Sequence, residues 1–447
     1  MEIVLDKKST TNATIKVQLT EADYQPKINA KLKEYGKNIS LKGFRQGKVP
    51  AQLVEKMYGK SIKVDEINHL LTESVQNYVK DQNLKIIGYP LPDQQKAQSI
   101  DWDTQSNFEF YYEIGLIPDF KYELSDKVKV TKYTIKADAA KVEETIDNMR
   151  RQYGKMDDAE TASEEDYLNG DMKEVASDFE TKTLLPMNRI KKDALSLFLG
   201  KKAGDVITFD IEKIFEDASY IAYSTGLSKE EAATKKGKFT FTVTGVRRNT
   251  PAPLDQEMFD KVFGKDAVTN EADFRTRLLD TIQNNYTREA EALVARDVRE
   301  YYLSNVKIDL DAEFLKRWLK VNNDGKMTDE QIENDIELYT KDLRWLLIRN
   351  KIGEDNSIQV DHQDVLNKTK ELFLQQFGMS LEAMGEEMAE TIDKVAQNYL
   401  TSENGKNYNR TFEEVYYTKV LQLIESKITL QEKSISVDEF EKLASAN

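Results

Sequence analysis

The chain is 447 residues long, which is more than one hydrophobic core usually organises, so about two to four domains are expected. Hydrophobic residues make up 39% of it and charged residues 32%, a balance that favours an elongated molecule with much solvated helix surface over a compact enzyme. The net charge of −15 argues against a protein that binds nucleic acid along its whole length.

The charge is unevenly distributed along the chain. Residues 1–60 hold 12 Lys and Arg against 6 Asp and Glu, whereas the remaining 387 residues hold 52 against 73. A basic end on an acidic body indicates a docking module carried by the rest of the protein.

Residue types that commonly form disulfides, metal sites and catalytic triads are scarce. There is no cysteine, and the two histidines, His69 and His362, lie far apart, so disulfides and histidine-based zinc or triad chemistry are not expected. No nucleotide loop, metal motif or paired carboxylates stand out, so we predict no catalytic residue, no metal and no cofactor. The N-terminus lacks the apolar run of a signal peptide and no later segment approaches a membrane span, which favours the cytoplasm and no membrane partner.

The first part of the chain has a mixed pattern. Thr20 and Asp23 have the spacing of a capping box at the start of a helix. Alternating apolar residues predict strands, and i, i+4 spacing predicts helices. In chain order we expect strands at 3–7 and 13–19, a helix from 20 to about 35, helices at 50–58 and 64–81, and a strand at 108–114.

Residues 41–50 (Leu-Lys-Gly-Phe-Arg-Gln-Gly-Lys-Val-Pro) form the most informative segment. They are too polar for a core strand and too rich in glycine for a helix. Three cations and one aromatic residue between flexible glycines are typical of a loop tip that meets an anionic partner.

The middle of the chain combines a helix with a β-rich segment. We expect an extended segment at 128–135, a helix from an N-cap at Asp138 to about Tyr153, and an acidic, weakly patterned linker at 155–170. Clear strands are predicted at 206–211 and 238–246.

The last part contains no proline, because all eight prolines lie at or before Pro253. Helix interiors exclude proline, and apolar residues at i, i+4 spacing run from Phe274 to Leu293 and again from Phe412 to Ile424. These observations predict that 254–447 is all α-helical.

Set in this pattern, Gly43 to Pro50, followed by Tyr58-Gly59, resembles the ribosome-docking signature of the bacterial trigger factor family. The resemblance covers nearly the whole chain. Further matches follow in the family's order: Ala203-Gly204-Asp205, Lys236-Gly237-Lys238-Phe239, the run from Pro253 to Phe259, Phe263-Gly264, and the closing Ile428 to Lys433 with Glu439-Phe440.

The resemblance implies an α+β multidomain protein that works as an ATP-independent, ribosome-associated chaperone. The domains expected from it are an α+β ribosome-binding domain (1–118), a linker that packs with the C-terminal body (119–153), a small β-rich FKBP-like domain (154–250) and an elongated all-α chaperone body with arms (251–447). The implied partners are the large ribosomal subunit, through rRNA and a protein at the exit rim, and nascent or unfolded polypeptides. A homodimer away from the ribosome stays an open alternative.

The docking loop is where the resemblance is most specific. Cations can release counterions from rRNA, Arg45 can pair with a phosphate or carboxylate, and Phe44 can fill an apolar pocket. Gln46 departs from the family, which usually has a lysine there, so altered binding of the loop to the ribosome is expected. The predicted ribosome-binding residues are Lys42, Gly43, Phe44, Arg45, Gln46, Gly47 and Lys48.

The FKBP-like domain matches the family less well. FKBP-type isomerases hold a prolyl peptide in an apolar pocket, and their catalysis depends on the shape of that pocket. By ungapped counting, the pocket floor falls on Lys191, Lys192, Asp193 and Ala194, which cannot line it. We therefore expect weak or absent peptidyl-prolyl isomerase activity. Aromatic residues that could form a residual pocket, although a core role is more common for them, are Phe215, Tyr220, Tyr223 and Phe241.

Apolar clusters in the helical part are candidates for client binding, with helix–helix packing as the alternative. The residues singled out are Trp345, Leu372, Phe373, Phe377, Met379, Met384 and Met388. Two other functions stay open: an active proline isomerase that acts on nascent chains, and an RNA-binding ribosome-assembly factor without clients.

Overall fold

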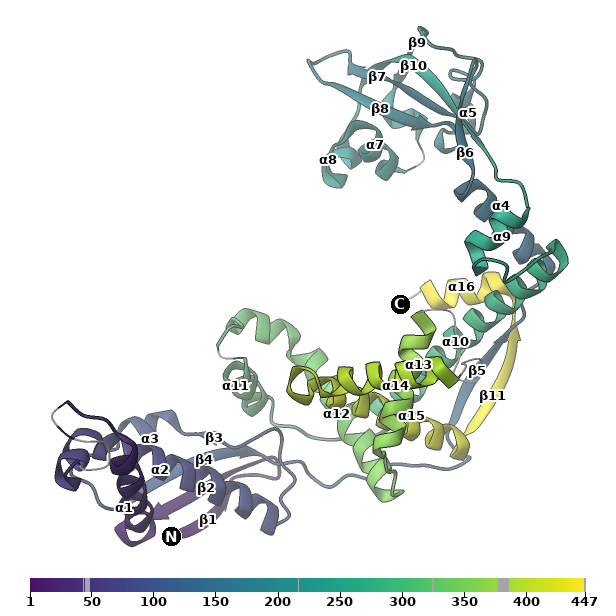
Figure 1. Ribbon diagram of the computed structural model, residues 1–447. Helices are drawn as coiled ribbons and strands as arrows, with labels where there is room; N and C mark the ends of the chain where they lie inside the picture. The colour runs from purple at the N-terminus through teal and green to yellow at the C-terminus, as the bar shows by residue number, and fades with distance from the viewer. Residues whose placement is uncertain (43, 45–48, 216, 324, 377–385, 446–447) are drawn as a thin grey trace. The chain divides into compact units, whose positions relative to one another are not determined.

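The computed structural model describes residues 1–42, 44, 49–215, 217–323, 325–376 and 386–445. It contains two compact units, one formed by residues 1–132 with 293–432 and the other by 133–292 with 433–447. In both units, segments that are distant in sequence fold together. Figure 1 labels the elements of both units.

An antiparallel sheet with strand order β1-β2-β4-β3 forms the N-terminal part of the first unit. One face of β2, carrying Ala13, Ile15 and Val17, is fully buried because the two long helices α1 and α2 pack against it. The elements are β1 (Glu2–Lys7), β2 (Asn12–Leu19), α1 (Glu21–Asn38), α2 (Ala51–Asp81), β3 (Leu91–Pro92), α3 (Gln94–Gln98) and β4 (Phe108–Gly115).

The start of α1 matches the sequence prediction, whereas the extent of α2 differs from it. The capping box is confirmed, since the Asp23 carboxylate accepts the Thr20 backbone N–H at 2.8 Å. The prediction of separate helices at 50–58 and 64–81 was wrong, because α2 runs without a break through Gly59. A glycine in a helix interior costs about 1 kcal/mol, which the burial of Ile62, Ile67 and Leu71 on the sheet outweighs.

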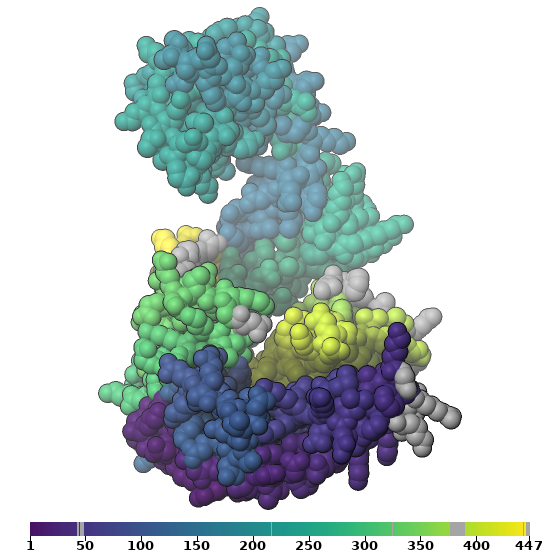
Figure 2. Space-filling model, turned by 90° about the vertical axis from the view of Figure 1, so that its left-hand side faces the viewer, coloured from purple at the N-terminus to yellow at the C-terminus, as the bar shows by residue number. Residues whose placement is uncertain are grey.

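A small β domain belongs to the second unit. Its long central strand β10 pairs with β7 on one side and with both β9 and β6 on the other, and β8 pairs with β7. Figure 2 shows one face of residues 155–250 (blue to teal), which has a rounded outline. Its elements are β6 (Lys155–Ala159), β7 (Tyr167–Glu174), β8 (Glu180–Pro186), the 3-10 turn η1 (Met187–Arg189), α5 (Lys192–Leu195), β9 (Val206–Asp210), α6 (Ile211–Ile214), α7 (Ala218–Thr225), α8 (Lys229–Thr234) and β10 (Lys238–Thr250).

The predicted strands at 206–211 and 238–246 are confirmed as β9 and β10. The predicted linker at 155–170 was wrong, because β6 and the start of β7 occupy it. Four of the five residues of β6 are exposed, so this strand lacks the apolar alternation by which strands are recognised.

Helices make up most of the remaining chain in both units. In the first unit, Tyr302, Ile348, Ile352, Val420 and Ile424 form the centre of a buried core. The helices are α4 (Ala139–Gln152), α9 (Gln256–Phe263), α10 (Glu271–Asn305), α11 (Ala312–Asn322), α12 (Asp329–Asp355), α13 (His362–Gln376), α14 (Glu386–Thr401), α15 (Lys406–Lys427) and α16 (Val437–Ser445), with a 3-10 turn η3 (Glu403–Gly405) before α15.

In the second unit, α4 joins the N-terminal half of α10. Val142 and Ile146 of α4 pack with Phe259 of α9 and with Phe274 and Leu278 of α10. The predicted N-cap of α4 is confirmed, because the Asp138 carboxylate accepts the Lys141 backbone N–H at 2.9 Å.

One strand interrupts the helical C-terminal part. β11 (Thr429–Ile435) pairs with β5 (Lys129–Ile135), and the Thr429 N–H donates to the Val128 carbonyl at 2.9 Å. The prediction that 254–447 is entirely α-helical was therefore wrong over β11, although helices dominate the rest.

Candidate functional sites

The basic loop connects α1 to α2. α1 ends at Asn38, and the extended conformation of its C-cap residue, Ile39, leads the chain out of the helix. Among the predicted docking residues, Lys42 and Phe44 are described, and the Phe44 N–H donates to the Leu41 carbonyl at 3.0 Å. The Phe44 side chain is 42% exposed, which is unusual for a ring of this size. Gly43, Arg45, Gln46, Gly47 and Lys48 lie outside the described residues.

The base of this loop carries apolar surface that the sequence prediction did not include. Tyr35 at the end of α1 lies against Tyr58 of α2, with ring centroids 5.2 Å apart. Tyr35 and the nearby Met57 are both exposed. The sequence gives no signal that sets these two side chains apart, and only the structure shows that they are exposed.

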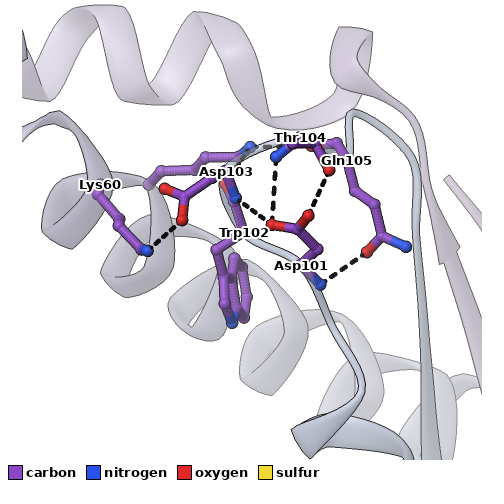
Figure 3. A network of polar contacts seen from close by, with 7 residues as sticks. Lys60, Asp101, Trp102, Asp103, Thr104 and Gln105 are labelled. Carbon is purple, nitrogen blue, oxygen red and sulfur yellow. Dashed lines mark hydrogen bonds and ion pairs between the residues drawn. The ribbon is translucent and has the colours of Figure 1, made fainter.

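A tight turn at residues 101–105 contacts α2 through Lys60, as Figure 3 shows. Its centre is the Asp101 carboxylate, which accepts the backbone N–H groups of Asp103 at 2.9 Å and Thr104 at 3.3 Å, and also the Thr104 hydroxyl. The Thr104 hydroxyl and these N–H groups lower the pKa of Asp101 below its ordinary value. Lys60 of α2 pairs with Asp103 at 2.6 Å.

Lys63, one turn further along α2, is held by the same turn. Its ammonium donates to the carbonyls of Trp102 at 3.2 Å and Gln105 at 3.0 Å, and lies 4.9 Å from the ring centroid of Phe108. Lys63 is therefore tied to this turn by two carbonyls and an aromatic ring, whereas Lys60 makes an exposed ion pair with it.

The four aromatic residues proposed for a residual prolyl pocket occupy different environments. Phe215 and Phe241 are buried in the core of the β domain. Tyr220 stacks on Phe215 at 6.3 Å between ring centroids and lies 5.3 Å from the Arg189 guanidinium. Tyr223 is 60% exposed. The two phenylalanines thus act as core side chains here, because their rings offer almost no surface to a peptide.

The segment counted as the pocket floor is short and helical. Lys191 is the N-cap residue of α5, and its backbone N–H donates a hydrogen bond to the Ile214 carbonyl at 2.8 Å. Lys192, Asp193 and Ala194 form the first turn of α5. Nothing in this turn supplies the aromatic floor that a prolyl ring would need.

The residues proposed for client binding also separate into classes. Trp345 is only 7% exposed and packs against Tyr302 with ring centroids 6.3 Å apart, so it belongs to the helical core. Leu372 and Phe373 are half-buried, and Phe373 meets the edge of Tyr399 at 5.5 Å. Met388 belongs to α14, while Phe377, Met379 and Met384 lie outside the described residues.

Exposed apolar side chains occur where the sequence pattern did not point. Leu346, next to the buried Trp345, is 39% exposed, and Leu338 of the same helix is more exposed still. Val321 at the end of α11 and Val395 in α14 are also exposed. Periodicity alone assigns such residues to a helix face but does not tell which face meets solvent.

Within the residues placed by the structure, no group of three His, Asp or Glu side chains is arranged to hold a metal ion. Over that part of the chain, none of the helices combines the length and apolar character needed to span a bilayer.

Comparison with known proteins finds matches along most of the chain. Sequence profiles of trigger factors match three successive parts of the chain: the bacterial trigger factor protein at residues 1–149, the FKBP-like domain of probable trigger factors at 156–251, and the C-terminal domain of probable trigger factors at 290–444. The chain belongs to the trigger factor family. As a member of that family it is a ribosome-associated chaperone, with ribosomes and nascent chains as partners.

Individual relatives are similar over most of their length. The trigger factor of Salinibacter ruber is 23% identical over 434 residues, which cover 90% of this chain and 91% of that protein. The trigger factor of Chlorobium chlorochromatii is 24% identical over 472 residues, covering 98% and 99%. A solved trigger factor structure, from work on promiscuous substrate recognition in folding and assembly, aligns over 95% of this chain and 99% of that chain with 14% identity and a TM-score of 0.44.

Proposed function

We propose that the chain docks on the large ribosomal subunit through residues 42–48 and shields emerging polypeptides there without ATP. The observation that carries this proposal is the exposed aromatic ring of Phe44 in a basic loop that matches the family's docking signature. A hydrophobic anchor surrounded by cations suits a rim made of protein and rRNA.

In this proposal, different residues of the loop make apolar and charged contacts with the ribosome. Phe44 enters an apolar pocket of a protein at the exit rim, and Arg45 pairs with a carboxylate or phosphate beside it. Lys42 and Lys48 contribute salt-dependent attraction to rRNA. Gln46 replaces one charged contact by a neutral hydrogen bond, which weakens or redirects the grip. Tyr35 and Met57, exposed at the base of the loop, add apolar area to the same contact.

The client surface in this proposal consists of exposed and half-exposed apolar side chains of the helical part, such as Leu346, Leu372 and Phe373. Leucine, phenylalanine and methionine side chains on helices adapt to many unfolded partners. The FKBP-like domain then serves mainly as a spacer or an additional client surface, with little isomerase activity. The cytoplasm is the proposed location, and a homodimer is an open possibility away from ribosomes.

A chaperone assay tests the client half of the proposal. Full-length protein is added without nucleotide to a chemically denatured model protein on dilution, and light scattering is followed. We expect aggregation to be suppressed at a near-stoichiometric ratio. A ribosome-assembly factor without clients would leave the scattering unchanged, and that result would contradict the proposal.

A further inference from the structure

The first turns of α11 are joined to one end of the N-terminal sheet by polar contacts. The Asn12 side-chain amide of β2 donates to Glu113 of the neighbouring strand at 3.1 Å and to Asp311 at 2.7 Å. Asp311 is the N-cap residue of α11, and Arg317, later in the same helix, pairs with Glu113 at 2.7 Å. These contacts hold α11 against the ends of β2 and β4.

An apolar cluster accompanies these polar contacts. Ile87 and Leu91 of the N-terminal domain pack with Phe314 and Leu315 of α11. All four side chains are buried, and the two from α11 have no exposed surface at all. The cluster contributes more to this contact than the ion pair does, because burial of apolar side chains stabilises strongly whereas exposed ion pairs contribute little.

Gly115, at the end of β4, leaves room for one ring of this cluster. A Cβ atom at this position would lie 2.5 Å from Phe314 Cδ1, which is closer than real Cβ atoms approach. The φ angle of Gly115 lies outside the left-handed region that favours glycine. Glycine is therefore required here by the ring of Phe314 and not by the φ angle of the backbone.

Trp318, one turn after Phe314, lies against a second glycine of the N-terminal domain. A Cβ atom at Gly88 would overlap the Trp318 indole, and the ring of Tyr89 lies 5.5 Å from that of Trp318 between centroids. Residues four apart share one face of a helix. One face of α11 thus fits two glycines of the N-terminal domain, which is typical of a close-packed joint.

α12 connects this joint to the helical core of the first unit. Its first part contributes Ile336, Tyr339 and Leu343 to the cluster around Phe314. Trp345, two residues further along, already belongs to the helical core. One unbroken helix therefore takes part in both clusters.

We propose that the N-terminal domain is rigidly joined to the helical core through α11 and α12. Domains of one chain usually move relative to each other unless their contact is well packed, and the contacts at Gly88 and Gly115 supply that packing. The helices α1 and α2, which flank the docking loop, then keep a fixed position relative to the exposed Leu338 and Leu346 of α12. The importance of that fixed position for a client rests on the function proposed above, whereas the joint itself needs neither ribosome nor client.

Double electron–electron resonance on the full-length protein, without ribosomes, tests the joint. The chain has no cysteine, so spin labels at Gln76→Cys in α2 and Gln422→Cys in α15 measure a single distance across the joint. Labels at Gln76→Cys and Gln94→Cys, both within the N-terminal domain, give the width that two labels on one rigid body produce. All three positions are exposed.

The first test variant is Gly115→Ala, whose added methyl group meets the Phe314 ring. Its control is Gly245→Ala in β10, another glycine outside the left-handed region, where an added Cβ atom would meet no described atom within 4 Å. A second test variant, Arg317→Glu with Trp318→Ser, opens the same joint from α11 and leaves the core between the N-terminal sheet and α1 and α2 unchanged.

We expect a single, narrow distance distribution across the joint in wild type and in the Gly245 control, and one about twofold broader in both test variants. The distribution between Gln76 and Gln94 should stay narrow in every protein. If it broadens in Gly115→Ala, the α11 variant alone decides. A broad distribution across the joint in wild type, or a narrow one in the test variants, overturns the rigid joint.

Ribosome co-sedimentation of the same preparations separates this proposal from the docking function. If wild type gives a narrow distribution but does not pellet with ribosomes, the joint stands and the proposed docking is wrong. If wild type pellets with ribosomes but its distribution is broad, the docking stands and only the joint is wrong.

Discussion

Arg248 and Asp166 form a two-pronged ion pair in the FKBP-like domain. The Arg248 Nε donates to Asp166 Oδ1 at 2.8 Å and its Nη2 donates to Oδ2 at 2.7 Å. The Asp166 carboxylate is 1% exposed and also accepts the Ser163 N–H at 2.7 Å. This pair connects β10, the last strand of the domain, to the residue just before β7. It therefore joins the last strand of the domain to a segment near the domain's first strands.

Arg248→Met is expected to destabilise this domain by about 2 kcal/mol, because it leaves a buried carboxylate without its counter-ion. Hydrogen exchange of backbone amides in β7 and β10 of the full chain measures the effect. Arg247→Met is the matched control, since Arg247 pairs at 3.6 Å with Asp158, whose side chain is almost fully exposed, and we expect less than about 0.5 kcal/mol there. Equal protection of these amides in wild type and Arg248→Met would show that the Arg248–Asp166 pair does not stabilise the domain.

The same pair predicts a dependence on pH. Burial alone would raise the pKa of Asp166, but the Arg248 guanidinium and the Ser163 N–H outweigh it and hold the pKa below the ordinary 3.8. The ionised carboxylate therefore contributes its full stability above pH 3.8 and loses it as the pH falls through the lower, folded-state pKa. The Tm difference between wild type and Asp166→Asn should shrink below about pH 4. Parallel Tm profiles down to pH 2 would show that the pair does not act in this way.

Isomerase activity should be low. In a protease-coupled assay with a prolyl peptide we expect kcat/KM about two orders of magnitude below that of an ordinary FKBP domain. Phe215 and Phe241 are buried in the core, and Lys192 and Asp193, at the positions that the sequence count assigns to the pocket floor, form the first turn of α5. An FKBP domain of known activity serves as the positive control in the same assay. Turnover equal to that control would mean that another pocket binds the proline.

Two adjacent residues of α12 should behave differently. Trp345→Ala is expected to destabilise the helical core by about 3–5 kcal/mol, since it removes a buried indole. Leu346→Ser should leave the Tm nearly unchanged but reduce suppression of aggregation, because this side chain is exposed. Leu199→Ser, at a similarly exposed leucine in the FKBP-like domain, is the control. A Leu346 variant with full chaperone activity would remove this residue from the client surface.

Local chemistry in the sequence predicted those elements whose signals are local. Asp138 and the pair Thr20 and Asp23 marked helix starts because a cap needs only residues within one turn. The apolar alternation of β2 and β10 marked strands because one face of each is buried. The docking signature likewise sits within ten consecutive residues.

Elements that depend on distant partners were missed. β11 is largely polar and pairs with β5 about 300 residues earlier, so no local pattern distinguishes it from loop or helix. The exposure of Leu346 beside the buried Trp345, and the close contact of Phe314 with Gly115, likewise depend on which neighbours the fold brings together. Candidate residues for client binding could therefore be grouped by sequence but not divided into core and surface.

Ribosome co-sedimentation tests the central claim most directly. Wild type should pellet with 70S ribosomes at low salt and be released progressively as salt rises. Phe44→Ala combined with Arg45→Ala should abolish pelleting. The control Tyr223→Ala with Arg288→Ala, which removes an exposed aromatic residue and an exposed arginine elsewhere, should pellet as wild type does. Unchanged pelleting of the Phe44 and Arg45 variant would contradict docking through this loop.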